Sequence, residues 1–79
     1  MITAYILVNV KPGKENTLIE NVKKESENVR VIEGNVVYGE YDVIIKVEAE
    51  NLEDIRKFVL DKIRSFDFVE RTITLISAE

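Results

Sequence analysis

The side chains that could do chemistry in this 79-residue chain are few in kind, because it contains no histidine, cysteine or tryptophan. Without histidine and cysteine, the commonest general base and the thiol nucleophile are missing, and zinc loses its usual ligands. The carboxylates of Glu40 and Asp42 lie close together beside Gly39, but a short turn does not bury such a pair. The composition therefore disfavours catalysis, and we expect neither a metal nor a cofactor.

A second polar segment, Lys11-Pro12-Gly13-Lys14, precedes a predicted helix, where an anion could bind the helix N-terminus. It contains no glycine-rich loop or Walker pattern, so a solvated turn is the favoured interpretation. The chain has 11 basic and 15 acidic residues, whereas a surface that binds DNA or RNA is basic. No apolar run is long enough to span a membrane, and no signal peptide is recognisable. We expect a cytoplasmic protein with neither nucleic acid nor membrane as a direct partner.

Apolar periodicity predicts the elements that must position these residues. Period-2 alternation indicates four strands, at residues 2–10, 29–38, 42–49 and 69–77. Helical spacing indicates two helices, at residues 14–27 and, after the N-cap Asn51, from Leu52 to Phe66. The order β-α-β-β-α-β predicts a ferredoxin-like α+β fold, a four-stranded antiparallel sheet with both helices on one face, in a single domain of residues 1–79.

The first and third predicted strands are apolar on both faces. Tyr5 and Leu7 flank Ile6, and Ile44 follows Val43, although helices cover only one face of this fold. A domain of this size without disulfides or zinc needs stabilisation from elsewhere. We therefore expect a second copy of the chain to pack on the open face of the sheet.

The turn GEYD at 39–42 is followed by an apolar strand, a capped helix and a last strand reading ERTITL, and KPGK follows the first strand. In this order and spacing, the whole chain resembles the effector-binding (RAM) domain of the Lrp/AsnC family of transcriptional regulators. The resemblance implies a homodimer of the dimeric α+β barrel type that assembles into an octamer or similar ring. It also implies an amino-acid effector bound between dimers near the turn that joins strands two and three.

A helix-turn-helix domain normally precedes this module in the family. Because residue 1 already begins the first strand, we expect a stand-alone version that modulates full-length Lrp/AsnC regulators. The sequence departs from the family before the last strand, where Asp67-Phe68 replaces the usual Pro-Gly. We therefore infer neither a loop shape nor a ligand contact at these two residues from the resemblance.

A free amino acid presents an ammonium and a carboxylate, so its pocket needs an anionic acceptor and a set of donors. Asp42 offers a carboxylate to the ammonium, and backbone N–H groups beside Gly39 offer donors to the carboxylate. By resemblance, the turn and the last strand supply the candidate ligand-binding residues Gly39, Glu40, Tyr41, Asp42, Arg71, Thr72 and Thr74.

Each candidate also has a purely structural interpretation. Gly39 is a turn residue, and Asp42 is suited to capping the turn's own backbone. Tyr41 suits interface packing as well as a ligand wall. Arg71 suits an exposed surface pair, and the two threonines are ordinary strand residues.

Three functions remain open from the sequence. The first is an amino-acid-sensing, oligomeric regulatory module, and the second is an assembly partner that needs no ligand. The third is a cofactor-free enzyme of the dimeric α+β barrel type, which has little support because a fold alone does not assign an activity.

Overall fold

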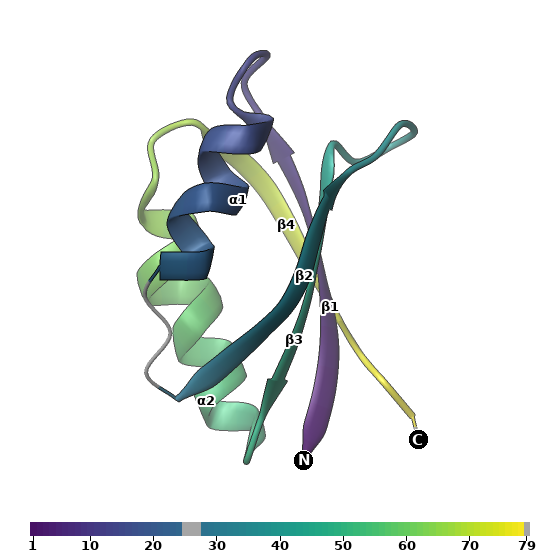
Figure 1. Cartoon of the computed structure of the whole chain (residues 1–79), viewed down its shortest axis with the longest axis vertical. Coiled ribbons are helices and arrows are strands. Elements are labelled where there is room, and N and C mark those ends of the chain that lie inside the picture. The colour runs from purple at the N-terminus through teal and green to yellow at the C-terminus, as the bar shows by residue number, and fades with distance from the viewer. Residues whose placement is uncertain (25–27, 79) are drawn as a thin grey trace.

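The computed structural model describes residues 1–24 and 28–78 and confirms the predicted order of elements (Figure 1). The elements are β1 (Ile2–Val10), α1 (Glu15–Lys24), β2 (Val29–Val36), β3 (Val43–Ala49), α2 (Leu52–Lys57) and β4 (Val69–Ile76). The helical path of α2 continues through a π turn at Phe58–Lys62 and a 3-10 turn at Ile63–Ser65.

The four strands form one sheet in the order β2-β3-β1-β4, and each neighbouring pair is antiparallel. Both helices lie against the same side of this sheet (Figure 1). This is the ferredoxin-like arrangement that the sequence predicted. The loop between β2 and β3, the turn between β1 and α1 and the start of β4 all lie at one end of the molecule (Figure 1).

The core lies between the sheet and the helices, and it follows from side-chain alternation along the two central strands. Every second residue of β1 and β3 is buried against α1 and α2, beginning with Ala4 and Val43. The helices contribute the matching apolar residues Leu18, Ile19, Val22, Ile55, Phe58, Val59 and Ile63. Among the described residues no polar or charged side chain is buried.

The boundaries of the second and third strands differ from the predictions where the two strands are connected. The second strand ends at Val36 and the third begins at Val43, because residues 37–42 form a loop that the N–H of Val37 closes by donating to the carbonyl of Asp42 at 2.9 Å. The predicted first helix extends to residue 27, and its last three residues lie outside the described ones.

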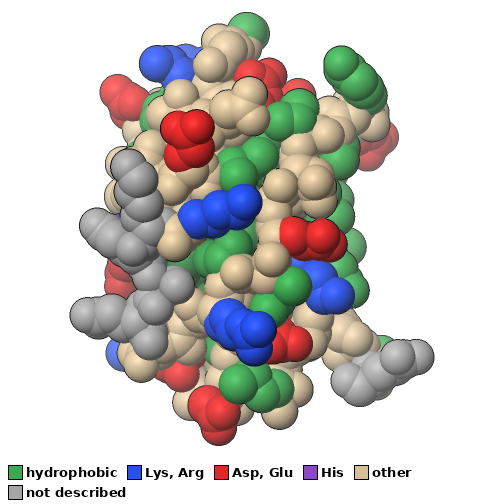
Figure 2. Space-filling view, in the orientation of Figure 1, with side chains coloured by type: hydrophobic (Ala, Val, Ile, Leu, Met, Phe, Trp, Pro, Cys, Tyr) green, Lys and Arg blue, Asp and Glu red, His purple; other side chains and the backbone are tan. Residues whose placement is uncertain are grey.

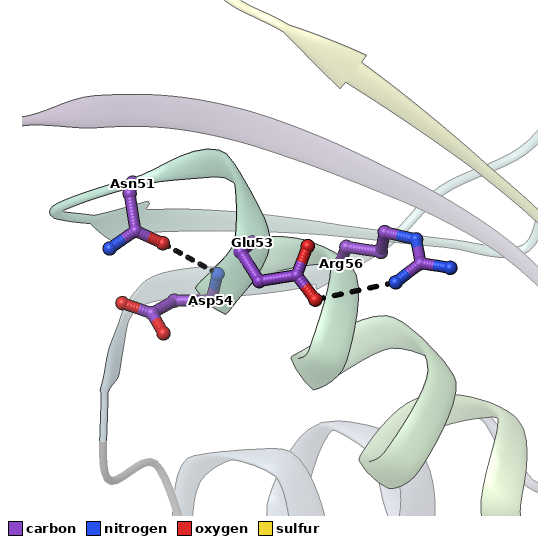
Figure 3. A network of polar contacts seen from close by, with 4 residues as sticks. All are labelled: Asn51, Glu53, Asp54 and Arg56. Atoms are coloured by element: carbon purple, nitrogen blue, oxygen red, sulfur yellow. Dashed lines mark hydrogen bonds and ion pairs between the residues drawn. The ribbon is translucent and has the colours of Figure 1, made fainter.

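One local prediction, the N-cap at Asn51, is confirmed. The side chain of Asn51 accepts a hydrogen bond from the N–H of Asp54 at 2.9 Å and so caps α2 (Figure 3). Gly34 lies beside a register shift in the β2–β3 pairing, and a Cβ there would be only 3.2 Å from Cγ2 of Ile19. Glycine therefore permits α1 to approach β2 closely.

The face of the sheet opposite the helices carries the second set of strand side chains. Leu7 lies opposite both Ile44 and Ile73, and Tyr5 lies opposite Leu75. In Figure 2, hydrophobic side chains run along the margin that faces away from the helices. We call this set, namely Tyr5, Leu7, Ile44, Ile73 and Leu75, the open-face strip.

Candidate functional site

The loop 37–42, which contains the GEYD turn, is attached to the end of β1. The N–H of Asp42 donates to the carbonyl of Val8 at 3.0 Å. Gly39 has φ +136, and a Cβ there would meet no atom within 4 Å. The backbone conformation alone therefore requires glycine at this position.

The carboxylate of Asp42 also binds β1, and not the turn's own backbone as the structural alternative supposed. Its Oδ2 accepts from the N–H of Val10 at 3.0 Å and from Nδ2 of Asn9 at 3.3 Å. The β1–β3 pairing ends at Val8 opposite Val43, so the N–H of Val10 lies beyond the ladder. A carboxylate satisfies that donor where no strand partner remains.

Asn9 is a residue that the sequence reasoning missed. Its Nδ2 donates to the carbonyl of Glu40 at 3.0 Å, and it also donates to Oδ2 of Asp42. One side chain thus holds two points of the loop. The available signal was a single amide that follows Tyr5 and Leu7 on the same face of the strand.

Tyr41 and Arg71 come together although they are 30 positions apart in the sequence. The guanidinium carbon of Arg71 lies 4.9 Å from the centroid of the Tyr41 ring, which is a cation–π geometry. Arg71 is the partner of Asn9 in the β1–β4 register. The structure therefore gathers the loop 37–42 and Arg71 around the end of β1.

The two threonines do not join this group. Thr72 lies opposite Val8, and Thr74 lies opposite Ile6. The side chains of Val8 and Ile6 are both buried in the core. Directly opposed residues share a face of the sheet. Thr72 and Thr74 therefore lie on the helix side, whereas Arg71 lies on the open side.

Two hollows adjoin β4. A polar one of about 300 Å³ is lined by Arg64, Val69, Glu70, Arg71 and Thr72. We call it the β4 hollow. An apolar groove of about 420 Å³ separates α2 from β4, and it is lined by Leu52, Glu53, Ile55, Arg56, Val59, Leu60, Thr74 and Ile76. An ion pair of 3.3 Å joins Glu53 and Arg56 at this groove (Figure 3).

The two remaining sequence features form ordinary turns. In KPGK, Gly13 has φ +88 and the N–H of Lys14 donates to the carbonyl of Lys11 at 3.1 Å. The Asp67-Phe68 turn is held by a hydrogen bond from the N–H of Lys11 to the carbonyl of Phe68 at 2.9 Å. The ring of Phe68 stacks on that of Phe66, with centroids 5.2 Å apart.

Within residues 1–24 and 28–78, no group of three or more histidine, cysteine, aspartate or glutamate side chains is arranged to hold a metal ion. In the same residues, no helix has the length and hydropathy needed to cross a membrane.

A sequence model described as the Lrp/AsnC ligand binding domain matches residues 3–79. The chain belongs to the Lrp/AsnC ligand-binding domain family. Its resemblance to these regulators is thereby confirmed over nearly the whole chain.

Two solved structures share the fold of this chain along nearly their whole length. FFRP-DM1 is 42% identical, with a TM-score of 0.85 over 98% of this chain and 99% of that one. A protein from Thermus thermophilus, TTHA0845, is 30% identical, with a TM-score of 0.88 over 100% of this chain and 95% of that one.

Curated relatives are regulators that carry this module as one part. The HTH-type transcriptional regulator FL11 of Pyrococcus horikoshii is 41% identical over 73 residues, which are 92% of this chain and 46% of that protein. The chain spans about half the length of the curated relatives it matches. These relatives support a regulatory role for the Lrp/AsnC ligand-binding domain described here.

Proposed function

We propose that this chain is an oligomeric regulatory module that binds an amino acid and modulates full-length Lrp/AsnC regulators by co-assembly in the cytoplasm. The observation that carries the proposal is the convergence of the loop 37–42 and Arg71 at the end of β1. A relative from Neisseria meningitidis, NMB0573, has been solved as a complex with L-Met. Its fold matches this chain with a TM-score of 0.80.

Asp42 can hold the loop and still receive a ligand. Both of its hydrogen bonds within the described residues use Oδ2, so Oδ1 is the oxygen that an ammonium would reach. Asp42 is half-buried, and partial shielding from water strengthens a charge-assisted hydrogen bond. Backbone N–H groups of the glycine turn are the matching donors for a carboxylate.

The open-face strip supports the assembly part of this proposal. Ile73 and Leu75 are 42% and 52% exposed, and they adjoin Leu7 and Tyr5 across β1. Burying such a surface against a second copy removes apolar area from water. Sheet-to-sheet packing of two chains produces the dimeric α+β barrel, and further contacts between dimers would complete a ring.

Regulation would then be a shift between assembly states. In this proposal, contacts between dimers form at the end of the sheet that carries the loop 37–42, and a ligand there stabilises the state that binds it more tightly. A ligand with equal affinity for both states would regulate nothing.

The test is calorimetric titration with the twenty amino acids at millimolar concentration. At least one is expected to bind, and Asp42→Asn is expected to abolish binding because it removes the charge while keeping an oxygen for the N–H of Val10. Asp61→Asn, an exposed change on the helix side, is the matched control. No binding by any amino acid would contradict the sensor.

A ligand-independent assembly partner is the second candidate, favoured by the open-face strip alone. It predicts a stable ring and a complex with a full-length relative, both unchanged by any amino acid. Sedimentation velocity with and without the amino acids that bind distinguishes the two functions. Under either proposal the role is regulatory and not catalytic.

A further inference from the structure

Four charged side chains lie together on the open face of the sheet, on the neighbouring strands β2 and β3. Arg30 lies opposite Glu48, and Glu33 lies opposite Lys46. Lys46 and Glu48 alternate with the buried residues of β3, and Lys46 is the partner of Tyr5 in the open-face strip. Because directly opposed residues share a face, all four side chains lie on the side away from the helices. We call them the charge square.

The alternation of sign in the charge square depends on an irregularity in β2. The β2–β3 register shifts between Val31 and Glu33, so that Glu33 and not Ile32 is the residue opposite Lys46. Each neighbour within the square, along a strand or across the pair, then has the opposite charge. The four charges cancel, whereas the whole chain carries a net charge of -4. The square is therefore a neutral surface on an acidic chain, where a second copy meets no net repulsion.

The charges of the square are only partly neutralised within the chain. Nη1 of Arg30 lies 3.8 Å from Oε1 of Glu48, and the Arg30 side chain is 74% exposed. An exposed pair at this distance contributes little. Among the described residues, Glu33 and Lys46 form no ion pair with each other. The square therefore remains available to charges from outside the chain.

The ammonium of Lys46 connects the charge square to the open-face strip. Its Nζ lies 5.8 Å from the centroid of the Tyr5 ring, and Lys46 is half-buried. A second copy that covers the strip would take this ammonium further from water. A charge that loses water in this way needs a counter-ion, and a carboxylate of the covering chain can supply it.

We propose that the charge square packs on the charge square of a second copy of this chain. Two-fold symmetry, the commonest in homo-oligomers, brings the same surface of both chains together. A two-fold axis that runs across the strands, between the two cross-strand pairs of the square, turns each charge onto one of the opposite sign. Lys46 then meets Glu48 of the second copy, and Arg30 meets its Glu33.

The position of the strip selects this axis. An axis along the strands, between β2 and β3, would also oppose the signs. It would, however, carry β1 and β4 beyond the edge of the second copy's sheet, since the strand order is β2-β3-β1-β4. The axis across the strands keeps β1 and β4 of both copies facing each other. This inference rests on the proposed assembly, and it names the contact that favours a second copy over a chain without the alternation.

Sedimentation velocity of charge-reversal variants tests this contact. Lys46→Glu and Glu48→Lys each place two like-charge contacts in a homodimer, and each is expected to raise the dimer dissociation constant at least about tenfold. An equimolar mixture of the two variants has opposite signs at every contact, so it is expected to associate as tightly as the wild-type chain. Lys57→Glu, the same substitution at an exposed position of α2, is the matched control and is expected to leave association unchanged.

Folding is measured separately, because each reversal also brings like charges together within its own sheet. Far-ultraviolet circular dichroism and urea denaturation report the fold of each variant. A chain that carries both Lys46→Glu and Glu48→Lys regains opposite signs in its homodimer, and it is expected to associate again. Loss of fold does not predict recovery in the mixture or in the double variant.

The outcomes separate this inference from the proposed function. A wild-type dimer that neither reversal weakens overturns the contact and leaves the regulatory module intact. Reversals whose mixture does not recover, or an equal loss caused by Lys57→Glu, overturn the pairing of Lys46 with Glu48. A wild-type chain that does not self-associate overturns both the contact and the proposed assembly.

Discussion

At the scale of single residues, Asn9 is the side chain on which the candidate loop depends. It joins the carbonyl of Glu40 and the carboxylate of Asp42 to β1, and Arg71 lies opposite it on the neighbouring strand. A strand residue therefore fixes the shape of a loop about 30 residues away.

Replacing Asn9 with alanine should loosen the loop. The change removes two hydrogen bonds, and we expect the free energy of unfolding to fall by about 1 kcal/mol. Urea denaturation gives this value, and hydrogen exchange should report faster exchange of the Asp42 N–H. Asn16→Ala, on the exposed side of α1, is the control, and an equal loss of stability there would contradict a specific role for Asn9.

Gly39→Ala measures the free-energy cost of placing a residue other than glycine at the positive φ of this position. Because a Cβ at this position meets no atom within 4 Å, the loss of stability, about 1–2 kcal/mol, comes from positive φ alone. Thermal unfolding measures it. Glu40→Ala on the adjacent exposed residue is the comparison, and a similar effect there would show that the loop tolerates no substitution.

At the scale of elements, the sequence predicted the strands and helices because each alternates or repeats with its own period. The N-cap at Asn51 followed from residue type and spacing. The continuation of α2 through a π turn and a 3-10 turn has no such signal. Short π and 3-10 turns keep nearly the same residues on the apolar face as an α-helix does. The spacing of apolar residues therefore cannot distinguish these turns from an α-helix.

The packing of α1 on β2 can be tested at Gly34. A Cβ there lies 3.2 Å from Cγ2 and 3.4 Å from Cγ1 of Ile19. Gly34→Ala should therefore destabilise the wild-type chain by about 1–3 kcal/mol. In an Ile19→Ala background the same change should cost much less, and a double-mutant cycle in urea measures the coupling. Additive effects would show that α1 shifts freely.

At the scale of the whole molecule, the open-face strip is the surface that the fold leaves without a cover. Leu75→Lys should shift the chain from dimer to monomer in sedimentation velocity, since Leu75 is 52% exposed and lies in the strip. Leu60→Lys is the matched control, because Leu60 is 41% exposed on the helix side. Dissociation by the control and not by Leu75→Lys would place the interface on the other face.

The sequence by itself determined the order of elements, the capped helix and the turn at Gly39, since each depends on residues close together in the chain. The order and spacing of these motifs then indicated the family. Only the tertiary structure decided which candidate residues meet. It joined Arg71 to Tyr41, placed Thr72 and Thr74 on the other side of the sheet, and added Asn9. The physical reason is register: neighbours across a sheet are set by strand pairing, and a shift of one residue moves a side chain to the opposite face.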